Sequence, residues 1–503
     1  MTAPHRIFGS LATDCEILII GSGAGGATLA HALTAAGRDV LMLEEGPYIA
    51  AEDAPPSVPE AFKKMWRGGG LTVALGNPPV AYAEGRCVGG GTEINSAIMQ
   101  RTPDDLLDQW ARRYAIRDYG PAPLAPYYEQ AEKLINASLT EPPLGRASDL
   151  LREGGEKLGW EVTPLKRAQK NCVGTNLCAA ACPTGGKQSM TAALLPVALA
   201  NGLRLIAECR VTKLGFKGNK IAKVNATARD AEGRSHRVTI RPRQVFVCAG
   251  AIHTPALLMR SGVRENIGRT LRLHPTAKIT ARFSDKIDAE NARLPLYAIT
   301  EFMPDQRLGG SVFLPGFFGM ALAEDWKRRA HLWEMRENTA IYYAMARAGT
   351  VGSVQPLPGM TEPLVRYQCA PEDLANLQQG LGRLAEAMFA AGAVELYPSI
   401  AGHEGWRSLD EVRRDRAHSL SPSALNLMTI HMFSSCPSGE RREICATDSY
   451  GRVHGFANLF VADASQIPEA PGVNPQLTIM ALALRNAEMF LSQTTQERAR
   501  AAS

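Results

Sequence analysis

The chain has 503 residues, which is enough for about two to four domains. Hydrophobic residues make up 45% and charged residues 21%, so the composition excludes a disordered, collagen-like or coiled-coil chain. A net charge of +5 is too small at this length to indicate nucleic acid as a partner. Because no apolar run approaches the ~18 residues of a membrane span and residues 1–23 lack a signal-peptide pattern, we expect a cytoplasmic protein without a membrane span.

A strand–helix–strand unit opens the chain. Residues 16–20 (EILII) are typical of a buried strand, residues 27–37 follow a helical pattern that ends at Gly37, and residues 40–44 predict a second strand. Between the first strand and the helix, the segment GSGAGG has the dinucleotide-binding spacing G-x-G-x-x-G. This unit predicts a Rossmann-like nucleotide-binding domain.

The glycines of this segment have separate physical roles. Gly21 permits a tight turn, Gly23 lets the backbone approach a pyrophosphate, and Gly26 lets the helix pack on the strand. The helix N-terminus attracts phosphate through its unpaired N–H groups and its dipole. Glu44, 18 residues after Gly26, can accept hydrogen bonds from a ribose hydroxyl. The fingerprint alone does not separate FAD from NAD.

Later segments predict further elements and a second domain. The expected elements are loops at 50–100, helices within 104–160, strands at 203–214 and 244–248, an antiparallel sheet within 274–345, a helix at 372–392, a strand at 458–463, and a helix from Pro475 to about Phe490. The last strand and helix resemble material of the first domain. We therefore expect an α/β protein with a nucleotide-binding domain at 1–270 and 426–503 and a substrate domain of antiparallel sheet and helices inserted at 271–425.

Two further segments contain closely spaced small residues. The first contains Gly85, Arg86, Gly89, Gly90, Gly91, Thr92 and Asn95. The second contains Ala249, Gly250, Thr254, Pro255, Leu258, Ser261 and Gly262. These segments resemble the two signatures of the glucose–methanol–choline (GMC) oxidoreductase family. Segments 431–439, 458–465 and 472–483 continue the family's order, so the resemblance spans nearly the whole chain.

The resemblance implies a GMC fold, FAD as cofactor and a catalytic pair. The family's catalytic histidine corresponds to His431 and its partner to Asn474. Residues 432–435 (MFSS) depart from the family's usual P-x-G-T, so the shape beside His431 can differ. Ile94 stands where some members have a histidine bonded to the flavin, and isoleucine cannot form that bond. We therefore expect non-covalent FAD.

The fingerprint and the resemblance together predict the cofactor-binding residues. They are Gly21, Ser22, Gly23, Ala24, Gly26, Glu44, Glu45, Arg86, Gly90, Gly91, Thr92, Asn95, Val211, Ala249, Gly250, Asp463, Ala464, Pro475 and Gln476.

Oxidation of an alcohol at its carbinol carbon requires removal of the hydroxyl proton. A neutral histidine is the natural base near pH 7, which favours His431 as base and Asn474 as a hydrogen-bonding partner of the same oxygen. Pro475 is predicted to start a helix whose dipole stabilises negative charge on a reduced flavin. The alternative for His431 is an ordinary buried histidine, and for His274 and His454 we expect structural roles.

Three cysteines cluster at Cys172, Cys178 and Cys182 with the spacing C-x5-C-x3-C-P, outside the common zinc patterns. The segment is similar to one in the family's iron–sulfur sugar dehydrogenases and to one in its long-chain alcohol oxidases. Structural thiols, an iron–sulfur cluster and a disulfide remain open, and no other metal site is predicted. The similarity to enzymes that pass electrons onward favours a dehydrogenase over an oxidase.

The predicted function is FAD-dependent oxidation of an alcohol to a carbonyl compound by a dehydrogenase or oxidase. Apolar residues at 313–326 favour an apolar or aromatic primary alcohol, or else they belong to the core. Alternatives are a lyase of the hydroxynitrile lyase type, an oxidase of a sugar or aminoglycoside alcohol, and a flavin-binding protein without chemistry. The electron acceptor, oxygen or a redox partner, is not predicted.

Overall fold

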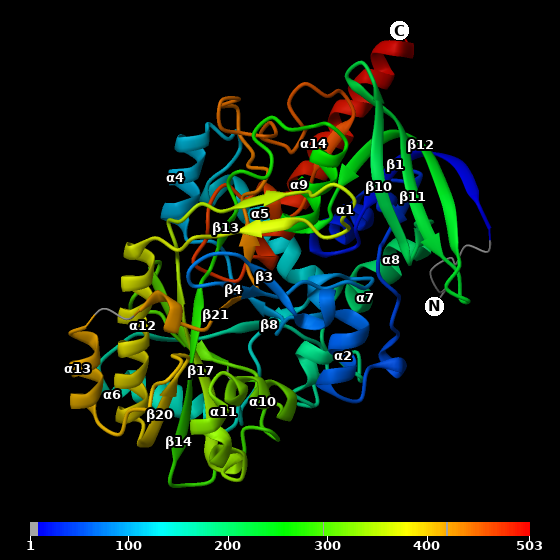
Figure 1. Cartoon of the computed structure of the whole chain (residues 1–503). Coiled ribbons are helices and arrows are strands. Elements are labelled where there is room, and N and C mark those ends of the chain that lie inside the picture. The colour runs from blue at the N-terminus through cyan, green and yellow to red at the C-terminus, as the bar shows by residue number, and fades with distance from the viewer. Residues whose placement is uncertain (1–8, 295, 419–420, 503) are drawn as a thin grey trace.

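The structure is a computed structural model that describes residues 9–294, 296–418 and 421–502 (Figure 1). Residues 1–8, on which part of the signal-peptide expectation rests, lie outside the described residues. Within these ranges, no helix is long and apolar enough to cross a membrane.

The first sheet has the strand order β10-β11-β12-β1-β2-β9, and β23 pairs with the end of β12. Its strands are β1 (Leu11–Ile20), β2 (Val40–Leu43), β9 (Arg204–Ile206), β10 (Cys209–Lys217), β11 (Lys220–Arg229), β12 (Ser235–Val247) and β23 (Leu459–Val461). Five neighbouring strands are parallel: β9, β2, β1, β12 and β23. The strands β10 and β11 extend the sheet with antiparallel pairing.

Both faces of the parallel strands are covered, as the apolar run of β1 requires. Ile17 and Ile19 face a core shared with the helices, and Leu18 and Ile20 face a second core on the other side of the sheet. On the first side, α1 (Ala24–Ala35) packs against α14 (Gln476–Ala502), and α14 packs against α5 (Pro121–Leu134). Segments from the two ends of the chain therefore complete one layer (Figure 1).

The second sheet has the order β3-β4-β21-β14-β17-β16-β15-β7, and β20 pairs with β14. Its strands are β3 (Thr72–Ala74), β4 (Val80–Tyr82), β7 (Val162–Pro164), β14 (Thr276–Phe283), β15 (Tyr297–Ile299), β16 (Gln306–Gly310), β17 (Thr339–Ala346), β20 (Ala393–Pro398) and β21 (Leu427–Thr429). The pairing is antiparallel except between β4 and β21. The helix α12 (Pro371–Ala390) covers one face and contacts β14, β17 and β20.

The remaining elements connect or flank these sheets. The other helices are α2 (Val58–Met65), α3 (Gly91–Ile94), α4 (Asp104–Tyr114), α6 (Arg146–Lys157), α7 (Met190–Ala193), α8 (Leu195–Ala200), α9 (Gly250–Arg260), α10 (Pro315–Ala323), α11 (Trp326–Arg329) and α13 (Leu409–Arg416). Short pairings are made by β5 (Ile98–Met99), β6 (Ala137–Ser138), β8 (Lys166–Ala168), β13 (Arg272–Leu273), β18 (Ser353–Gln355), β19 (Leu364–Arg366) and β22 (Met432–Phe433).

Some elements differ from the sequence expectation. Residues 50–100 contain α2, whose start is capped by the Ser57 hydroxyl accepting from the Glu60 N–H; the S-x-x-E capping pattern could have revealed it. Residues 91–94, expected as loop, form one helical turn, and residues 315–323 and 326–329 are helical within the expected antiparallel region. The last helix begins at Gln476 and reaches Ala502; Pro475 lies just before it, and its carbonyl accepts from the Ile479 N–H.

The second sheet also extends beyond the segment 271–425. It takes β3, β4 and β7 from earlier in the chain and β21 from just after it. These strands have three residues each, too few for a period-2 pattern to identify them. The domain boundaries themselves remain a prediction.

Candidate active site

A cavity of about 390 Å³ lies between the two sheets, in the size range of small-molecule sites. One side is formed by the carboxyl ends of the parallel strands, where Ile20, Leu43, Cys248 and Asp463 line it. Ligands of open α/β sheets bind at this edge because the loops and helix N-termini open there. The other side is the uncovered face of the second sheet.

The glycine-rich turn after β1 leaves room along the cavity. Gly21 has φ +102°, and a Cβ there would lie 2.3 Å from the Cys248 carbonyl oxygen. A Cβ on Gly26 would lie 2.1 Å from the Gly21 oxygen, so Gly26 serves the contact between helix and strand. A Cβ on Gly23 would meet nothing within 4 Å, and Gly23 lines the cavity. The space that a side chain would fill there suits the pyrophosphate of a dinucleotide.

The Glu44 carboxylate organises this turn. It accepts from the Ser22 N–H at 3.0 Å, the Ser22 hydroxyl at 2.6 Å and the Gly46 N–H at 2.9 Å. Burial raises the pKa of Glu44, and the hydrogen bonds from Ser22 and Gly46 act in the opposite direction. Because Ser22 Oγ also accepts from the Gly89 N–H at 3.0 Å, the turn is joined to the second glycine-rich segment.

The second glycine-rich segment lies against the first. A Cβ on Gly90 would come within 3.0 Å of Gly23 Cα, and Gly90 has φ +56°, a region that favours glycine. Asn95 Nδ2 donates to Gln476 Oε1 at 2.7 Å, which ties this segment to the first turn of α14. These links bring three parts of the predicted flavin site together.

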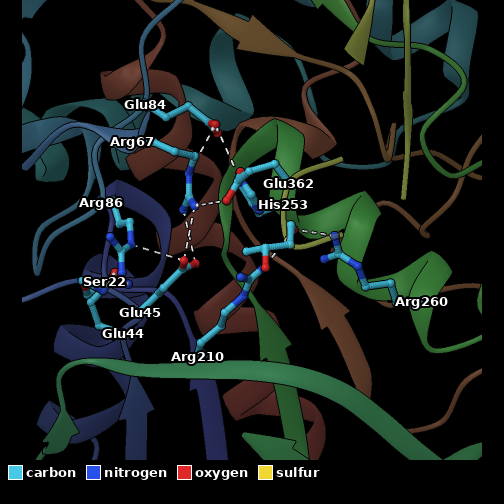
Figure 2. Close-up of polar contacts among 12 residues, drawn as sticks. Ser22, Glu44, Glu45, Arg67, Glu84, Arg86, Arg210, His253, Arg260 and Glu362 are labelled. Atoms are coloured by element: carbon cyan, nitrogen blue, oxygen red, sulfur yellow. Dashed lines mark hydrogen bonds and ion pairs between the residues drawn. The ribbon is translucent and has the colours of Figure 1, made fainter. Parts of the chain in front are cut away.

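A network of charged side chains lies beside the turn (Figure 2). Arg67 pairs with Glu45 at 3.2 Å, Glu84 at 3.6 Å and Glu362 at 3.3 Å. Although burial opposes it, the charge of Arg67 lowers the pKa of Glu45. Arg86 pairs with Glu45 at 3.3 Å. Glu362 comes from the loop between β18 and β19, so this network connects segments that lie far apart in the sequence.

His431 follows β21, and its backbone is held by the Thr429 hydroxyl. That hydroxyl accepts from the His431 N–H at 3.1 Å and donates to the His431 carbonyl at 3.0 Å. His431 Nε2 lies 3.2 Å from Asn474 Nδ2. Asn474 Oδ1 accepts from a guanidinium N–H of Arg307 on β16. The structure therefore brings the two predicted catalytic residues together and adds a buried cation behind them.

His274 contacts His431 on the opposite side of the ring. The Nδ1 atoms of the two imidazoles are 3.1 Å apart, and the Gly472 N–H donates to His274 Nε2 at 3.0 Å. His274 was expected only as a structural residue, and sequence reasoning missed this contact because the two histidines are 157 positions apart. His454, by contrast, lies outside the cavity lining and contacts the Gly439 carbonyl at 3.2 Å.

Gly472, His274, His431, Asn474 and Arg307 form a continuous series of contacts, here called the His431 chain. The N–H of Gly472 places the proton of neutral His274 on Nδ1, which then donates to His431 Nδ1. From the other end, Arg307 holds the Asn474 oxygen, so that the amide N–H₂ faces His431 Nε2 and favours a lone pair there. The two ends of the His431 chain, Gly472 and Arg307, therefore favour different tautomers of His431.

Burial keeps both imidazoles neutral. It lowers the pKa of His431 to about 3, with a further contribution from the charge of Arg307. Burial also holds the pKa of His274 well below its usual range, and the charges of Arg307 and Arg347 act in the same direction. Arg307 is 1% exposed, and its Nε and Nη2 atoms have no hydrogen-bond partner among the described residues.

Most of the predicted cofactor-binding residues line the cavity, although their contact with a flavin remains a prediction. Lining positions are Gly21, Ser22, Gly23, Ala24, Glu44, Glu45, Gly90, Gly91, Thr92, Asn95, Val211, Ala249, Gly250, Asp463, Ala464, Pro475 and Gln476. Gly26 packs under the turn and Arg86 points to Glu45, so neither lines the cavity. Lining residues that the sequence did not single out include Trp66, Arg67, Glu84, His253, Lys278 and Tyr343.

The apolar segment 313–326 contributes little to the cavity. Phe313 and Phe318 are buried in the core of the second sheet, and only Phe317 of the segment lines the cavity. Phe317 packs against Phe62 and Trp66. Most of this segment therefore belongs to the core, as the alternative prediction has it.

The three cysteines line one small cavity together with Arg167 and Lys187. All three cysteines are free, so the disulfide alternative is wrong. Cys178 Sγ accepts from Arg167 Nη2 at 2.8 Å, and the Lys187 ammonium donates to the Cys178 carbonyl at 2.7 Å. Across the described ranges, no group of three or more His, Cys, Asp or Glu could hold a metal ion. The iron–sulfur hypothesis therefore gains no support, and neither does the dehydrogenase preference drawn from it.

Comparison with known proteins identifies relatives along most of the chain. Profiles described as GMC oxidoreductase match residues 62–276 and 348–483, and a profile described as NAD(P)-binding Rossmann-like domain matches residues 19–54. An uncharacterized GMC-type oxidoreductase of Sinorhizobium fredii is 57% identical over 98% of this chain and 97% of its own length. A long-chain-alcohol oxidase of Arabidopsis thaliana is 27% identical over 93% of this chain and 67% of the oxidase.

The fold also has close neighbours among solved structures. Pyridoxine 4-oxidase from Mesorbium loti superposes with a TM-score of 0.71 at 19% identity, covering 95% of this chain and 99% of that structure. Together with the Rossmann-like match, this similarity confirms the predicted α/β fold class.

Proposed function

The chain belongs to the GMC oxidoreductase family and is an FAD-dependent alcohol oxidoreductase, and we propose that it oxidises an alcohol CH–OH group to a carbonyl with His431 as the base and Asn474 as its partner. FAD, when bound, supplies the acceptor for the hydride of the carbinol carbon. The remaining steps belong to side chains of this chain.

The observation that carries the proposal is the His431 chain. Base catalysis needs a neutral imidazole with a lone pair at Nε2, the ring nitrogen that lies beside Asn474. Burial supplies the neutral form, because the pKa of His431 is lowered to about 3. Arg307 supports the lone pair at Nε2 by holding Asn474 with its amide N–H₂ toward the ring.

His431 then takes the hydroxyl proton at Nε2, and Asn474 hydrogen-bonds the substrate oxygen and orients the carbinol carbon. In the reactive tautomer, which has its lone pair at Nε2, His431 donates its Nδ1–H to His274 Nδ1. His274 then carries its own proton on Nε2. Gly472 N–H then lacks its acceptor, which costs about 1–3 kcal/mol for a buried donor. The buried charge of Arg307 stabilises negative charge that develops on the substrate oxygen.

The residues around the glycine-rich turn fit a bound FAD. We assign the pyrophosphate to the space at Gly23 and the N-terminus of α1, and the ribose to Glu44. Ile94 lines the cavity and cannot bond covalently to a flavin, which supports non-covalent binding. The nucleotide-binding domain is proposed at 1–270 and 426–503 and the substrate domain at 271–425, with β3, β4, β7 and β21 joining the sheet of the latter.

The apolar part of the cavity lining supports a substrate with an apolar body. Val312, Phe317, Met345 and Met428 belong to this lining, and the Arabidopsis relative is named for long-chain alcohols. An apolar or aromatic primary alcohol is therefore the proposed substrate class.

An anaerobic panel of alcohols added to the purified flavoprotein tests the function. We expect bleaching of the flavin absorbance by at least one primary alcohol and formation of the corresponding aldehyde. A protein that cleaves a hydroxynitrile without bleaching would instead be a lyase, and one that neither bleaches nor cleaves would be a binding protein. Repeating the turnover in air with peroxide detection, and then with a dye, identifies the electron acceptor.

A further inference from the structure

A lysine lines the cavity on the side formed by the second sheet. Lys278 lies on β14, directly opposite Tyr343 of β17, and both line the cavity. Alternate residues of a strand point to opposite faces, so Thr276 and Lys278 share the cavity face while Ala277 and Ile279 enter the core. The strands β14 and β17 run side by side through the lower part of the molecule (Figure 1).

Lys278 has no charged partner in contact. In the part of the chain that the structure describes, its Nζ makes no hydrogen bond or ion pair. The backbone N–H of Lys278 donates to Ser399 Oγ at 3.2 Å, and its carbonyl accepts from the Ser399 N–H at 2.8 Å. Glu324 is the carboxylate whose charge acts on Lys278, and Glu324 is already paired with Arg329 at 3.3 Å. Two cations thus share one carboxylate.

This excess charge is unusual for a cavity wall. Charged groups removed from water are normally paired, because desolvation disfavours an isolated ion. Burial accordingly lowers the pKa of Lys278. An anionic group entering the cavity would complete the charge balance and would gain a strong hydrogen bond from the ammonium.

We propose that Lys278 is a specificity-determining residue that binds an anionic group, such as a carboxylate, on the end of the substrate remote from the oxidised carbon. The inference rests on the proposed function and narrows its substrate class. The substrate would have an apolar body between an alcohol and an anion.

The strand geometry sets the separation of these two ends. Lys278 is the third residue of β14 and lies four residues after His274, a separation of at most about 13 Å for an extended chain, and His274 contacts the proposed base. The anion is therefore expected on the order of 10 Å from the reacting carbon. Val312, Met345 and Met428 provide apolar surface along the same cavity.

The test is a homologous series of ω-hydroxycarboxylic acids, each compared with the 1-alkanol of equal carbon number, in a dye-coupled assay of the FAD-loaded enzyme. We expect kcat/KM to favour the acid by about 10–100-fold at one chain length, as a charged hydrogen bond provides. In Lys278→Met, which keeps an unbranched side chain, this ratio should fall to near one. Lys278→Arg should retain most of the preference.

The ratio of acid to alcohol within each variant cancels any general loss of activity. Lys223→Met, the same change at an exposed position of β11, should keep the wild-type ratio. If alcohols are oxidised but the acids are not preferred, or if Lys278→Met keeps the preference, the inference is overturned and the proposed function stands.

A binding measurement covers the case in which no alcohol of either series reduces the flavin, which would count against the proposed function. Calorimetric titration with the corresponding alkanoates and neutral alkanamides is then decisive. We expect alkanoates to bind at least tenfold more weakly to Lys278→Met than to wild type, with a smaller change for the amides. Equal loss for both ligands would refute the assignment of an anion site.

Discussion

The imidazoles of His274 and His431 meet through their Nδ1 atoms at 3.1 Å, and the Gly472 N–H occupies the far nitrogen of His274. A backbone N–H cannot reverse its hydrogen bond, so it biases the tautomers of both rings. His274 is thus a positioning residue for the proposed base, and its effect is open to measurement.

Replacing His274 by Phe should slow catalysis, because the Nδ1–H of the His431 imidazolium formed by proton transfer loses its buried acceptor. The loss of such a hydrogen bond predicts a fall in kcat/KM of about 5–150-fold. His274→Asn supplies an amide oxygen that can accept the Nδ1–H of His431, so we expect it to restore most of the activity. Steady-state kinetics at equal flavin content make the comparison, and equal damage in both variants would argue for a purely structural role.

His431→Ala should lower kcat/KM by about 10²–10⁴-fold, the usual contribution of a general base. The flavin content should remain near that of wild type, since His431 follows β21 of the second sheet and is not part of the glycine-rich turn. Asn474→Ala should lose less, because it orients the substrate and takes no proton. Near-normal turnover by His431→Ala would remove the proposed mechanism.

Arg307 should govern the acid side of the pH profile. With the pKa of His431 at about 3, the base stays neutral, so kcat/KM of the wild type should show no fall from this group between neutral pH and mildly acidic pH. Removing the cation in Arg307→Met raises that pKa, so more His431 is protonated as the pH falls and the activity should decline at a higher pH than in wild type. Burial still lowers the pKa, which keeps the shift partial.

Arg307→Lys is the matched control for this shift. It keeps the positive charge and loses the planar guanidinium, so the acid limb should stay close to that of wild type even if the rate falls. Superimposable pH profiles of the Met variant and the wild type would show that Arg307 does not act electrostatically on His431.

Glu44→Gln should weaken FAD binding by about 1–3 kcal/mol, because the carboxylate is a charged acceptor for Ser22 and is proposed to accept from the ribose. Fluorescence titration of the apoprotein with FAD measures the change. Glu52→Gln alters an exposed carboxylate nearby and should leave the affinity unchanged.

Acid precipitation of the holoenzyme should release the whole flavin into the supernatant with the mass of FAD. Ile94 provides no nucleophile for a covalent bond to the ring, which is the reason for this expectation. Yellow colour retained by the washed precipitate would contradict it.

The nucleotide-binding unit was readable from the sequence because its parts are contiguous. The apolar run of β1, the three spaced glycines and Glu44 lie within 28 residues, and each acts through local backbone geometry. The catalytic pair was located through a resemblance spread along the chain. His431 and Asn474, 43 positions apart, do lie 3.2 Å from each other.

Tertiary structure alone decided what surrounds that pair. Lys278 reaches the cavity because β14 pairs with β17 and lies beside β21, and Arg307 reaches Asn474 because β16 joins the same sheet. Antiparallel register between distant strands leaves no fixed spacing in the sequence, and a cation without a partner looks like any other charged residue until its neighbours are known. Local chemistry therefore identified the cofactor site, whereas long-range strand pairing determined the protonation of His431 and the charge on the side of the cavity formed by the second sheet.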